Sequence, residues 1–503
     1  MRPRSTRLPT VLLPLAVAGL ALFASPASAA PPAKPNIIFI VTDDQDLLLD
    51  SLKYMPRVHD LLANQGTTFS HAFVPLSLCC PSRTSILTGR YTHNTQVYTN
   101  SLPDGGFARF YALGLEQETV AVALQKVGYR TAILGKYLND YPLTVPPTYV
   151  PPGWNEWVVP SDGAPYTEFN YTLNENGSQV KFGHAATDYM TDVLAKRARR
   201  FITKAAADRV PFFLYLTPYA PHKPCTPAPR HAALFPGLKA PRTPSFNEAD
   251  VSDKPEAVRN LPLLTPELID AIDHLYRLRL QSLQAVDEAV GSIVQLLEAT
   301  GQMRNTYIIF TSDNGFHQGQ HRLFNSKYTA YEEDVRVPLI VRGPHVPANR
   351  VVDALTENVD FAPTIAQLAG ATLSSKVDGR SLVPLLRSGP VPPSGRQTVL
   401  LEQFHFTDGP GGGDSVLEPG DALKDEEHVT HRGLRTATFK FVEYGTGEHE
   451  YYDLVKDPYE LENLASHIGP LLMGQLTSRL NDLSQCQGGD CRALEAEPVP
   501  GLP

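Results

Sequence analysis

Short apolar runs, most of them followed by polar side chains, constrain the fold of this chain more than any other feature. The runs lie at residues 36–41, 129–134, 211–216, 306–311 and 337–341. Continuous apolar segments of this length are typical of strands buried on both faces of a parallel sheet. Segments expected to form helices lie between or after them, at residues 54–66, 120–127, 184–208, 265–300 and 359–368. The alternation predicts an α/β fold with a large, mainly parallel sheet and helices on both faces.

Polar residues follow four of these runs closely, and we expect their side chains to meet. They are Asp43 with Asp44, Lys136, His222, and Asp313 with Asn314. Ligands of open α/β sheets bind at the carboxyl ends of the strands, so these groups should share one edge. Adjacent carboxylates repel one another unless a cation lies between them. The oxygen-rich set Asp43, Asp44, Asp313 and Asn314 suits a hard divalent cation, whereas Asp43 and Asp44 alone would suit a solvated acidic turn.

Residues 79–90, with the sequence Cys-Cys-Pro-Ser-Arg-Thr-Ser-Ile-Leu-Thr-Gly-Arg, combine a thiol and two arginines in one short unit. Pro81 suits the first turn of a helix, and Ser82 can cap it. Cys79 then lies at the helix N-terminus, where the dipole and free N–H groups favour an anion. Arg83 lies one turn further on and can reach back to the same point. A buried cysteine pair capping a core helix is the structural alternative.

This unit resembles the signature of type I sulfatases, the formylglycine-dependent branch of the alkaline-phosphatase superfamily. The resemblance covers about residues 34–465 and looks nearest to the N-acetylglucosamine-6-sulfatase and arylsulfatase branch. It implies that a formylglycine-generating enzyme oxidises Cys79 to Cα-formylglycine, with Cys80 as the variable position. In many sulfatases a histidine follows two residues after the lysine that matches Lys136. Here Leu138 and then Asn139 follow, and Asn139 could replace that histidine as a hydrogen-bond donor.

The resemblance also implies roles for the polar residues at the sheet edge. Asp43, Asp44, Asp313 and Asn314 would bind Ca²⁺, or Mg²⁺ as in some members, and an oxygen of the modified Cys79 would complete the shell. Arg83 and Lys136 would lie near the formylglycine, His222 near the leaving group, and Lys327 on the sulfate. The implied reaction is hydrolysis of sulfate monoesters, either aryl sulfates or sulfated sugars such as 6-O-sulfated N-acetylglucosamine. His222 or Lys327 would protonate the departing alcohol.

Two other functions fit parts of the same pattern. One is a formylglycine-dependent hydrolase of phosphonate monoesters or phosphodiesters on the same fold. The other is a non-catalytic binder of sulfated glycans, against which the complete set of Cys79, Arg83 and acidic residues speaks. Phosphatase relatives use Ser or Thr with two zinc ions, so Cys79 argues against a phosphatase.

The N-terminal residues have the pattern of an export signal. Arg2, Arg4 and Arg7 precede an apolar run at residues 11–23, and Ala27-Ser28-Ala29 suits a signal peptidase. We therefore expect a signal peptide at 1–29, a catalytic domain at 30–390, and a C-terminal subdomain with a tail at 391–503. An uncleaved membrane anchor is the alternative to cleavage. The expected location is extracellular or periplasmic, with no membrane association afterwards, and the net charge of −9 argues against nucleic acid as a partner.

The remaining segments give weaker expectations. Short strands at 399–404, 435–437 and 439–444 and a closing helix at 471–483 predict a small antiparallel subdomain. Residues 141–182 are interpreted as a long insertion, 226–262 as a proline-rich loop, and 409–413 as a flexible loop that could border the cleft. Cys486 and Cys491 could close a small disulfide, whereas Cys80 and Cys225 could pair or remain free thiols. His93 and Asn94 fit satisfied loop residues better than cleft residues.

Overall fold

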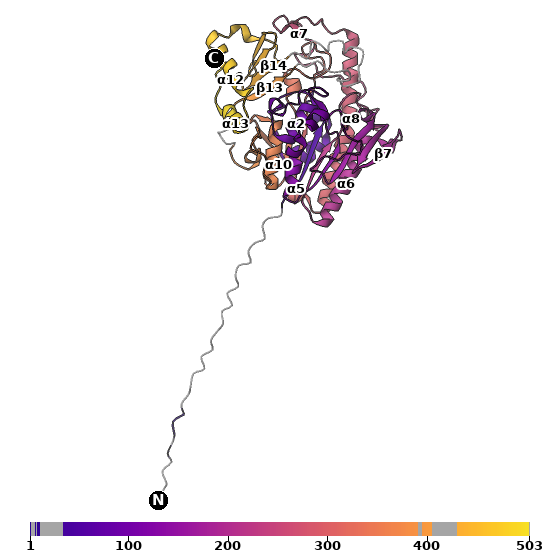
Figure 1. Cartoon of the computed structure of the whole chain (residues 1–503), viewed down its shortest axis with the longest axis vertical. Coiled ribbons are helices and arrows are strands. Elements are labelled where there is room, and N and C mark those ends of the chain that lie inside the picture. Colours follow the sequence, from indigo (N-terminus) through magenta and orange to yellow (C-terminus); the bar gives the residue numbers. More distant parts are fainter. Residues whose placement is uncertain (2–5, 7, 11–33, 391–394, 405–429, 502–503) are drawn as a thin grey trace. The chain divides into compact units, whose positions relative to one another are not determined.

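A ten-stranded sheet forms the centre of the computed structural model, which describes residues 1, 6, 8–10, 34–390, 395–404 and 430–501 (Figure 1). In spatial order its strands are β11 (Arg350–Val352), β2 (Thr67–Phe69), β10 (Leu339–Arg342), β9 (Thr306–Ser312), β1 (Asn36–Thr42), β8 (Phe212–Thr217), β4 (Arg130–Gly135), β5 (Glu156–Gly163), β6 (Tyr171–Glu175) and β7 (Ser178–Phe182). The central strands β9, β1, β8, β4 and β5 run parallel, while β10, β6 and β7 pair antiparallel with their neighbours. The predicted mainly parallel sheet is confirmed.

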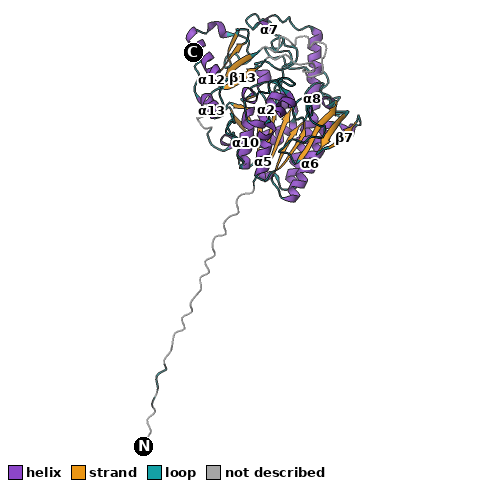
Figure 2. Cartoon of the chain, viewed as in Figure 1, coloured by secondary structure: helices purple, strands orange, loops and turns teal. Residues whose placement is uncertain are grey.

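Helices cover both faces of this sheet, and strand β1 shows why. Ile37, Phe39 and Val41 point into one apolar cluster, whereas Ile38 and Ile40 point into another. This alternation is the two-residue period of a strand buried on both sides. The first face is covered by α2 (Cys79–Thr88), α4 (Gly106–Ala112), α5 (Val120–Lys126) and α10 (Phe361–Ala369), and the second by α6 (Met190–Asp208) and α8 (Pro266–Ala299) (Figure 2).

A second, four-stranded antiparallel sheet lies in the C-terminal part of the chain. Its strands follow one another in the order β13 (Val399–Gln403), β14 (His431–Arg435), β15 (Phe439–Tyr444) and β16 (His449–Asp453). Helices α12 (Pro470–Leu483) and α13 (Gly489–Ala496) follow, and Leu476, Leu480 and Leu483 of α12 pack with Leu434 and Phe441 of the sheet. The antiparallel subdomain and its closing helix are as the sequence predicts, although β14 begins earlier than the predicted strand at 435–437.

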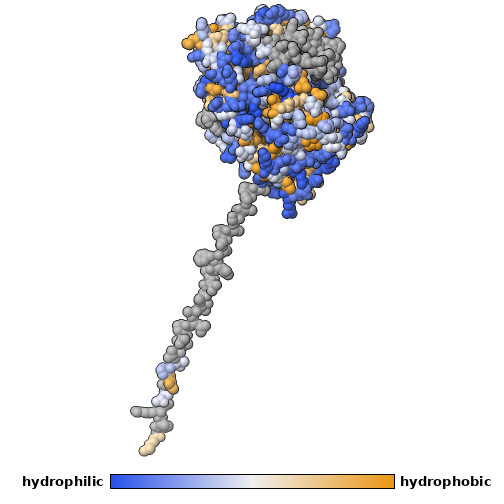
Figure 3. Space-filling view, viewed as in Figure 1, coloured by the Kyte–Doolittle hydropathy of each residue, from blue (hydrophilic) through white to orange (hydrophobic). Residues whose placement is uncertain are grey.

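Short elements complete the fold. They are the strand pair β3 (Ala72–Phe73) and β12 (Thr356–Glu357), and the helices α1 (Pro56–Val58), α3 (Thr92–Thr95), α7 (Glu256–Arg259) and α9 (Glu332–Val335). In the described part of the chain no helix combines the length and the apolar character that crossing a bilayer requires. The face seen in Figure 3 is mainly hydrophilic, with scattered apolar residues.

The region 141–182, interpreted from the sequence as a long insertion, forms part of the main sheet. It supplies β5, β6 and β7, which extend the sheet beyond β4, and Trp157 on β5 is fully buried. It also shortens the helix predicted at 184–208. Glu168 accepts hydrogen bonds from the backbone N and the hydroxyl of Thr191, at 2.8 and 2.9 Å, and α6 begins at Met190. The carboxylate caps the first turn from outside the helix, which the local sequence of the helix does not reveal.

Candidate active site

Four neighbouring strands end beside one another and carry polar residues into one cluster. Strands β9, β1, β8 and β4 are adjacent and parallel, so their carboxyl ends lie at the same edge. Asp313 and Asn314 follow β9, Asp43 and Asp44 follow β1, Lys136 follows β4, and His222 lies five residues beyond β8. All six side chains are buried. The edge predicted from the sequence therefore exists, and these residues meet there.

Two backbone features shape this edge. Gly135 has φ +113°, and a Cβ at this position would lie 2.1 Å from the carbonyl oxygen of Thr217. Only glycine fits where β4 and β8 approach so closely before Lys136. Asp44 has a left-handed backbone with φ 64°, which is unfavourable for a residue with a Cβ. Such conformations persist where surrounding contacts impose them, commonly at functional sites.

Helix α2 places Cys79 at the edge. Its N-cap is Leu78, and all residues from Cys79 to Thr88 are buried. The Ser82 hydroxyl donates to the carbonyl oxygen of Asp313 and accepts from Asn358 Nδ2 at 2.8 Å, which fixes the first turn of the helix against β9. Cys79 Sγ then lies 3.5 Å from Asp43 Oδ1 and 3.9 Å from Asp44 Oδ1. Cys79 therefore shares its pocket with both carboxylates.

Three cationic side chains surround the same point. Lys327 Nζ donates to Asp44 Oδ1 at 2.7 Å and to Cys79 Sγ at 2.9 Å. Lys136 Nζ donates to Asp43 Oδ2 at 2.7 Å. Arg83 donates from Nε to Asp313 Oδ2 at 2.8 Å and lies 3.6 Å from Asp43 Oδ1 through Nη2. An incoming anion such as a sulfate ester would find three buried positive charges beside the Cys79 side chain.

Charge and burial set the protonation states in this pocket. Burial alone would raise the pKa of Asp43, but Lys136, His222, Arg83 and Lys327 together hold it well below its usual range. Burial raises the pKa of Asp313 to about 6 despite the neighbouring Arg83. Burial also raises the pKa of the Cys79 thiol, although Lys136 and Lys327 oppose the rise. An unmodified Cys79 is thus a protonated, weakly nucleophilic thiol at neutral pH.

His222 is held by its backbone neighbour and by an aromatic ring. Its Nδ1 lies 2.7 Å from the carbonyl oxygen of Lys223, so Nδ1 carries the hydrogen and Nε2 is the nitrogen available for proton transfer. His222 Nε2 lies 3.6 Å from Asp44 Oδ2. The ring of Tyr166 packs against the His222 ring at 4.5 Å between centroids, and Lys136 Nζ lies 5.0 Å from the same Tyr166 centroid. Tyr166 therefore covers both an acid–base candidate and a cation.

Sequence reasoning missed Tyr166 and Arg279. Tyr166 belongs to the region interpreted as an insertion, and nothing local links it to His222. Arg279, fully buried in α8, donates from Nη2 to the carbonyl oxygen of Asp44 at 2.5 Å and from Nη1 to that of Pro221 at 3.3 Å. It thereby braces the loops that carry Asp44 and His222. The only sequence signal for the role of Arg279 was its position on the apolar side of a long predicted helix.

The carboxylate and amide oxygens at this edge suit a hard divalent cation. Asp43, Asp44, Cys79 and His222 each offer a ligand atom, and these atoms lie within 4.8 Å of one another. Asn314 Nδ2 donates to Asp44 Oδ1 at 2.8 Å, which leaves the buried Asn314 Oδ1 without a hydrogen-bond partner. An uncompensated buried carbonyl oxygen beside carboxylates is what a bound Ca²⁺ or Mg²⁺ would satisfy. Cys79 Sγ marks the position that an oxygen of formylglycine would take.

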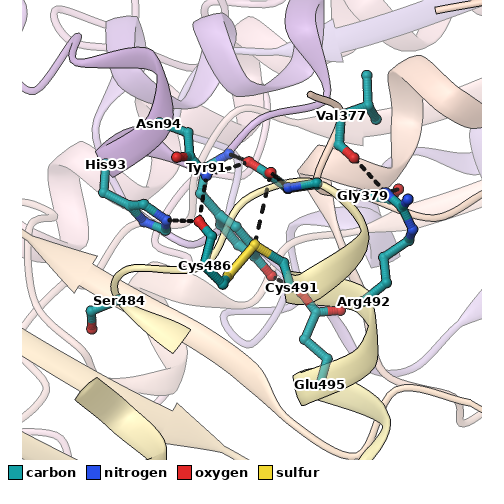
Figure 4. Close-up of a disulfide and its surroundings, with 12 residues drawn as sticks. Tyr91, His93, Asn94, Val377, Gly379, Ser484, Cys486, Cys491, Arg492 and Glu495 are labelled. Carbon is teal, nitrogen blue, oxygen red and sulfur yellow. Dashed lines mark hydrogen bonds between the residues drawn. A yellow bond between two sulfur atoms is a disulfide. The ribbon is translucent and has the colours of Figure 1, made fainter. Parts of the chain in front are cut away.

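Other residues considered from the sequence lie elsewhere. Asn139 Nδ2 donates to the Tyr166 hydroxyl at 3.4 Å. Cys80 and Cys225 are buried free thiols, whereas Cys486 and Cys491 form a disulfide. His93 and Asn94 contact the carbonyl oxygen of Cys486 at this disulfide, so they are satisfied residues of another region (Figure 4). The loop at 409–413 lies outside the described residues.

Comparisons with known proteins agree with this geometry. The family model described as Sulfatase matches residues 35–371. Human N-acetylglucosamine-6-sulfatase is 37% identical over 484 residues, which cover 92% of this chain and 87% of that protein. A solved protein in complex with its substrate D-glucosamine-2-N,6-O-disulfate is 25% identical with a TM-score of 0.73, covering 90% of this chain and 98% of the other. The phosphonate monoester hydrolase of Agrobacterium radiobacter, 23% identical over 89% of this chain and 94% of its own, shares the fold with a TM-score of 0.67.

The family match covers both acidic strand ends, the Cys79 helix and the lysines, and the relatives span nearly the whole chain. The chain therefore belongs to the sulfatase family, whose members hydrolyse sulfuric esters.

Proposed function

We propose that this chain is an exported sulfatase that removes sulfate from sugars, with 6-O-sulfated N-acetylglucosamine as the preferred unit. The observation that carries the proposal is the position of Cys79 Sγ, 2.9 Å from Lys327 Nζ and 3.5 Å from Asp43 Oδ1. A nucleophile at this point faces a cation for the sulfate oxygens and a carboxylate for a metal ion. The relative that acts on N-acetylglucosamine 6-sulfate and the neighbour solved with a 6-O-sulfated glucosamine support the sugar class.

The proposal includes oxidation of Cys79 by a formylglycine-generating enzyme, and a Ca²⁺ or Mg²⁺ ion held by Asp43, Asp44, Asp313 and Asn314. The formylglycine hydrate would supply the hydroxyl nucleophile, and the ion would supply positive charge at that oxygen. The raised pKa of the Cys79 thiol supports the need for such a modification, because the thiol itself is a poor nucleophile here.

The chain's own residues would then divide the remaining work. Arg83, Lys136 and Lys327 stabilise the negative charge that develops on the sulfate oxygens, because they are buried cations that need no reorganisation. His222 protonates the departing sugar oxygen from Nε2, since Nδ1 is held by the Lys223 carbonyl. Tyr166 keeps the His222 ring and the Lys136 ammonium group in place by packing on both.

Export is part of the same proposal. The buried disulfide between Cys486 and Cys491 supports it, because stable structural disulfides form in oxidising compartments. Of the predicted signal peptide at 1–29, the structure describes only residues 1, 6 and 8–10.

The test compares the turnover rates of different substrates by protein that has been produced together with a formylglycine-generating enzyme. Intact mass of the peptide that contains Cys79 first measures the conversion to the aldehyde. We then expect faster turnover of N-acetylglucosamine 6-sulfate than of the 4-sulfate isomer, and turnover of an aryl sulfate well above that of an aryl phosphonate. Faster phosphonate cleavage would favour the alternative that the Agrobacterium radiobacter neighbour suggests. Absence of hydrolysis by the converted enzyme would favour a glycan binder.

A further inference from the structure

A second buried polar cluster lies away from Cys79, where the segment after β9 meets the C-terminal sheet. His321, Glu333 and Glu460 each place one ligand atom there, and these atoms lie within 4.8 Å of one another. Their relative exposures are 0%, 4% and 1%, so water does not solvate them. Glu333 lies in α9, and Glu460 follows β16. His321 and Glu333, from one stretch of the sequence, therefore converge with the distant Glu460 in one buried cluster.

His321 is oriented as metal-binding histidines are. Its Nδ1 lies 2.7 Å from Glu248 Oε2, and its ring stacks on Tyr331 at 4.0 Å between centroids. Its Nε2 is buried and has no hydrogen-bond partner. Burial lowers the pKa of His321 well below its usual value, with Lys254 and Lys440 acting in the same direction, so the ring is neutral. A carboxylate on Nδ1 fixes the proton there and directs the Nε2 lone pair outward, the arrangement of a carboxylate–histidine–metal unit.

The cluster contains more buried carboxylates than buried cationic side chains, and this excess favours binding of a cation. The buried carboxylates are Glu248, Glu332, Glu333, Asp334, Glu450 and Glu460, and Asp334 contacts the His317 ring at 2.9 Å. The buried cations among them are Lys254, Lys440 and Arg435. Arg336 and Asp253 lie at the edge of the cluster in more exposed positions, and their opposite charges offset one another. The carboxylates therefore outnumber the lysine and arginine side chains, an excess that a divalent ion would reduce.

Among the described residues, the known contacts leave Glu333 and Glu450 without a lysine or arginine partner, whereas Glu460 pairs with Lys440 and accepts a hydrogen bond from the backbone N of Glu332 at 2.8 Å. Arg435 pairs with Glu332 at 2.9 Å, Lys254 lies 3.5 Å from Glu248, and Glu450 accepts from the hydroxyl groups of tyrosines. Lys440 contacts both Glu460 and, at 3.9 Å, Glu332. Glu333 accepts only a long hydrogen bond of 3.4 Å from the Ser245 hydroxyl among the side-chain contacts of the described residues.

We propose that His321, Glu333 and Glu460 form a structural site for a zinc-type divalent cation, separate from the catalytic residues. One imidazole nitrogen with two carboxylates suits zinc and disfavours Ca²⁺ and Mg²⁺, which prefer oxygen ligands alone. Glu248 orients His321 from behind, and the ion would tie the loop after β9 to the C-terminal sheet. The link reaches the catalytic edge, because the carbonyl oxygen of Glu333 accepts from the backbone N of Phe316 at 2.9 Å, two residues beyond Asn314.

The test measures zinc bound to the full, tag-free protein in excess Ca²⁺, so that the oxygen-rich catalytic site is saturated. Elemental analysis after gel filtration should find one zinc per chain in the wild type and none in His321→Gln and Glu333→Gln. Glu248→Gln should weaken zinc affinity by about 10- to 100-fold, as expected when the carboxylate behind a metal-binding histidine is removed. His345→Gln, which changes an exposed histidine, should retain the wild-type amount.

Anomalous diffraction at the zinc edge supplies the second measurement, and it does not depend on any variant folding. A peak among His321, Glu333 and Glu460 is expected. A wild type that retains no zinc at micromolar concentrations would overturn the proposal, because the two glutamates would then be neutralised by protons alone. A peak located elsewhere, or a folded His321→Gln protein with unchanged zinc content, would overturn it equally.

Discussion

The two ends of helix α2 lie in buried polar surroundings of different character. At the N-terminal end, Cys79 lies among carboxylates and cations, with Asp44 in a left-handed conformation and Asn314 Oδ1 without a partner. Beyond the C-terminal end, the Tyr91 hydroxyl lies within hydrogen-bond distance of Glu357 Oε2, at 2.6 Å, and of Glu495, and the Tyr91 backbone N donates to Asp378 at 2.8 Å. We call the second region, formed by Tyr91, His93, Glu357, Asp360, Asp378, Arg396, Glu402, Glu495 and the 486–491 disulfide, the C-terminal anchor.

In the anchor, one arginine binds a carboxylate through both of its Nη atoms. Among the described residues, no arginine does so at the catalytic end. Arg396 is fully buried and binds Asp360 through both Nη atoms, at 2.6 and 2.9 Å, and Glu495 through Nε at 2.9 Å. Glu495 belongs to α13, so this contact holds the C-terminal helix against the residues that follow α2. A left-handed backbone at Asp44 marks the proposed catalytic end, whereas bidentate pairing of Arg396 marks the anchor. Substitutions at the two ends should therefore separate activity from stability.

The largest effect is expected at Cys79. Cys79→Ala removes the side chain that would become the nucleophile, and kcat/KM for N-acetylglucosamine 6-sulfate should fall by about 10⁵-fold or more. The melting temperature should change little, since the small side chain is lost without breaking an ion pair. Steady-state kinetics with calorimetry measures both. Undiminished hydrolysis would remove Cys79 from the mechanism.

Arg396 should show the opposite behaviour. Arg396→Met leaves Asp360 buried without its cation, while Glu495 keeps Arg380 at 2.7 Å, and the free energy of unfolding should fall by about 3–5 kcal/mol. The fraction that remains folded should keep the wild-type kcat. Chemical denaturation measures the loss, with Arg304→Met as a control because Arg304 is exposed. A fall in kcat as large as that in Cys79→Ala, on folded protein, would show that the anchor is not separate from the catalytic end.

Lys136 tests the charge of the pocket. Lys136→Met should reduce kcat by about 10²–10³-fold, the cost of removing one group that stabilises developing oxyanions. KM should change less than kcat, because the charge develops mainly in the transition state. Lys126→Met changes a lysine at the end of α5 and serves as the matched control. A Lys136 effect confined to KM would assign this side chain to ground-state binding.

The smallest effect is a pH dependence of the anchor. Burial alone would lower the pKa of His93, but the Glu402 carboxylate, 2.8 Å from Nδ1, raises it to about 9. This value exceeds the pKa of about 6.5 that His93 has in the unfolded chain. The His93–Glu402 pair therefore stabilises the folded state fully below pH 6.5, and this contribution is lost as the pH rises through 9. The contribution is up to about 3 kcal/mol. Unfolding from pH 6 to 10 should show a steeper decline for the wild type than for His93→Gln, and parallel curves would contradict the assignment.

The sequence predicts the catalytic edge well, because each apolar strand carries its polar residue at a fixed place, its carboxyl end. The carboxyl ends of adjacent parallel strands lie at the same edge of the sheet, and this rule is enough to bring the polar residues together. Arg279 and Tyr166 could not be predicted in this way, since their roles arise from where a long helix and a strand connection pack in space. Strands β5, β6 and β7 were missed because Pro160 and the prolines around residues 146–152 disguise their alternation.

The anchor was predicted only in part. The spacing of Cys486 and Cys491 indicates a small loop, and the disulfide is confirmed. Helix α13 was missed because it is short and follows two glycines. Its ion pair with Arg396 joins residues 99 positions apart, and no local pattern carries that information.

If Cys79 is oxidised as proposed, its burial restricts when that step can occur. Its side chain has no exposed surface, and the helix that carries it is enclosed along its whole length. A second enzyme cannot reach this thiol in the folded chain, so the proposed oxidation must occur while the polypeptide is still extended. Chain that folds first would be trapped as an inactive thiol form, and adding the oxidising enzyme to purified native protein would not rescue it.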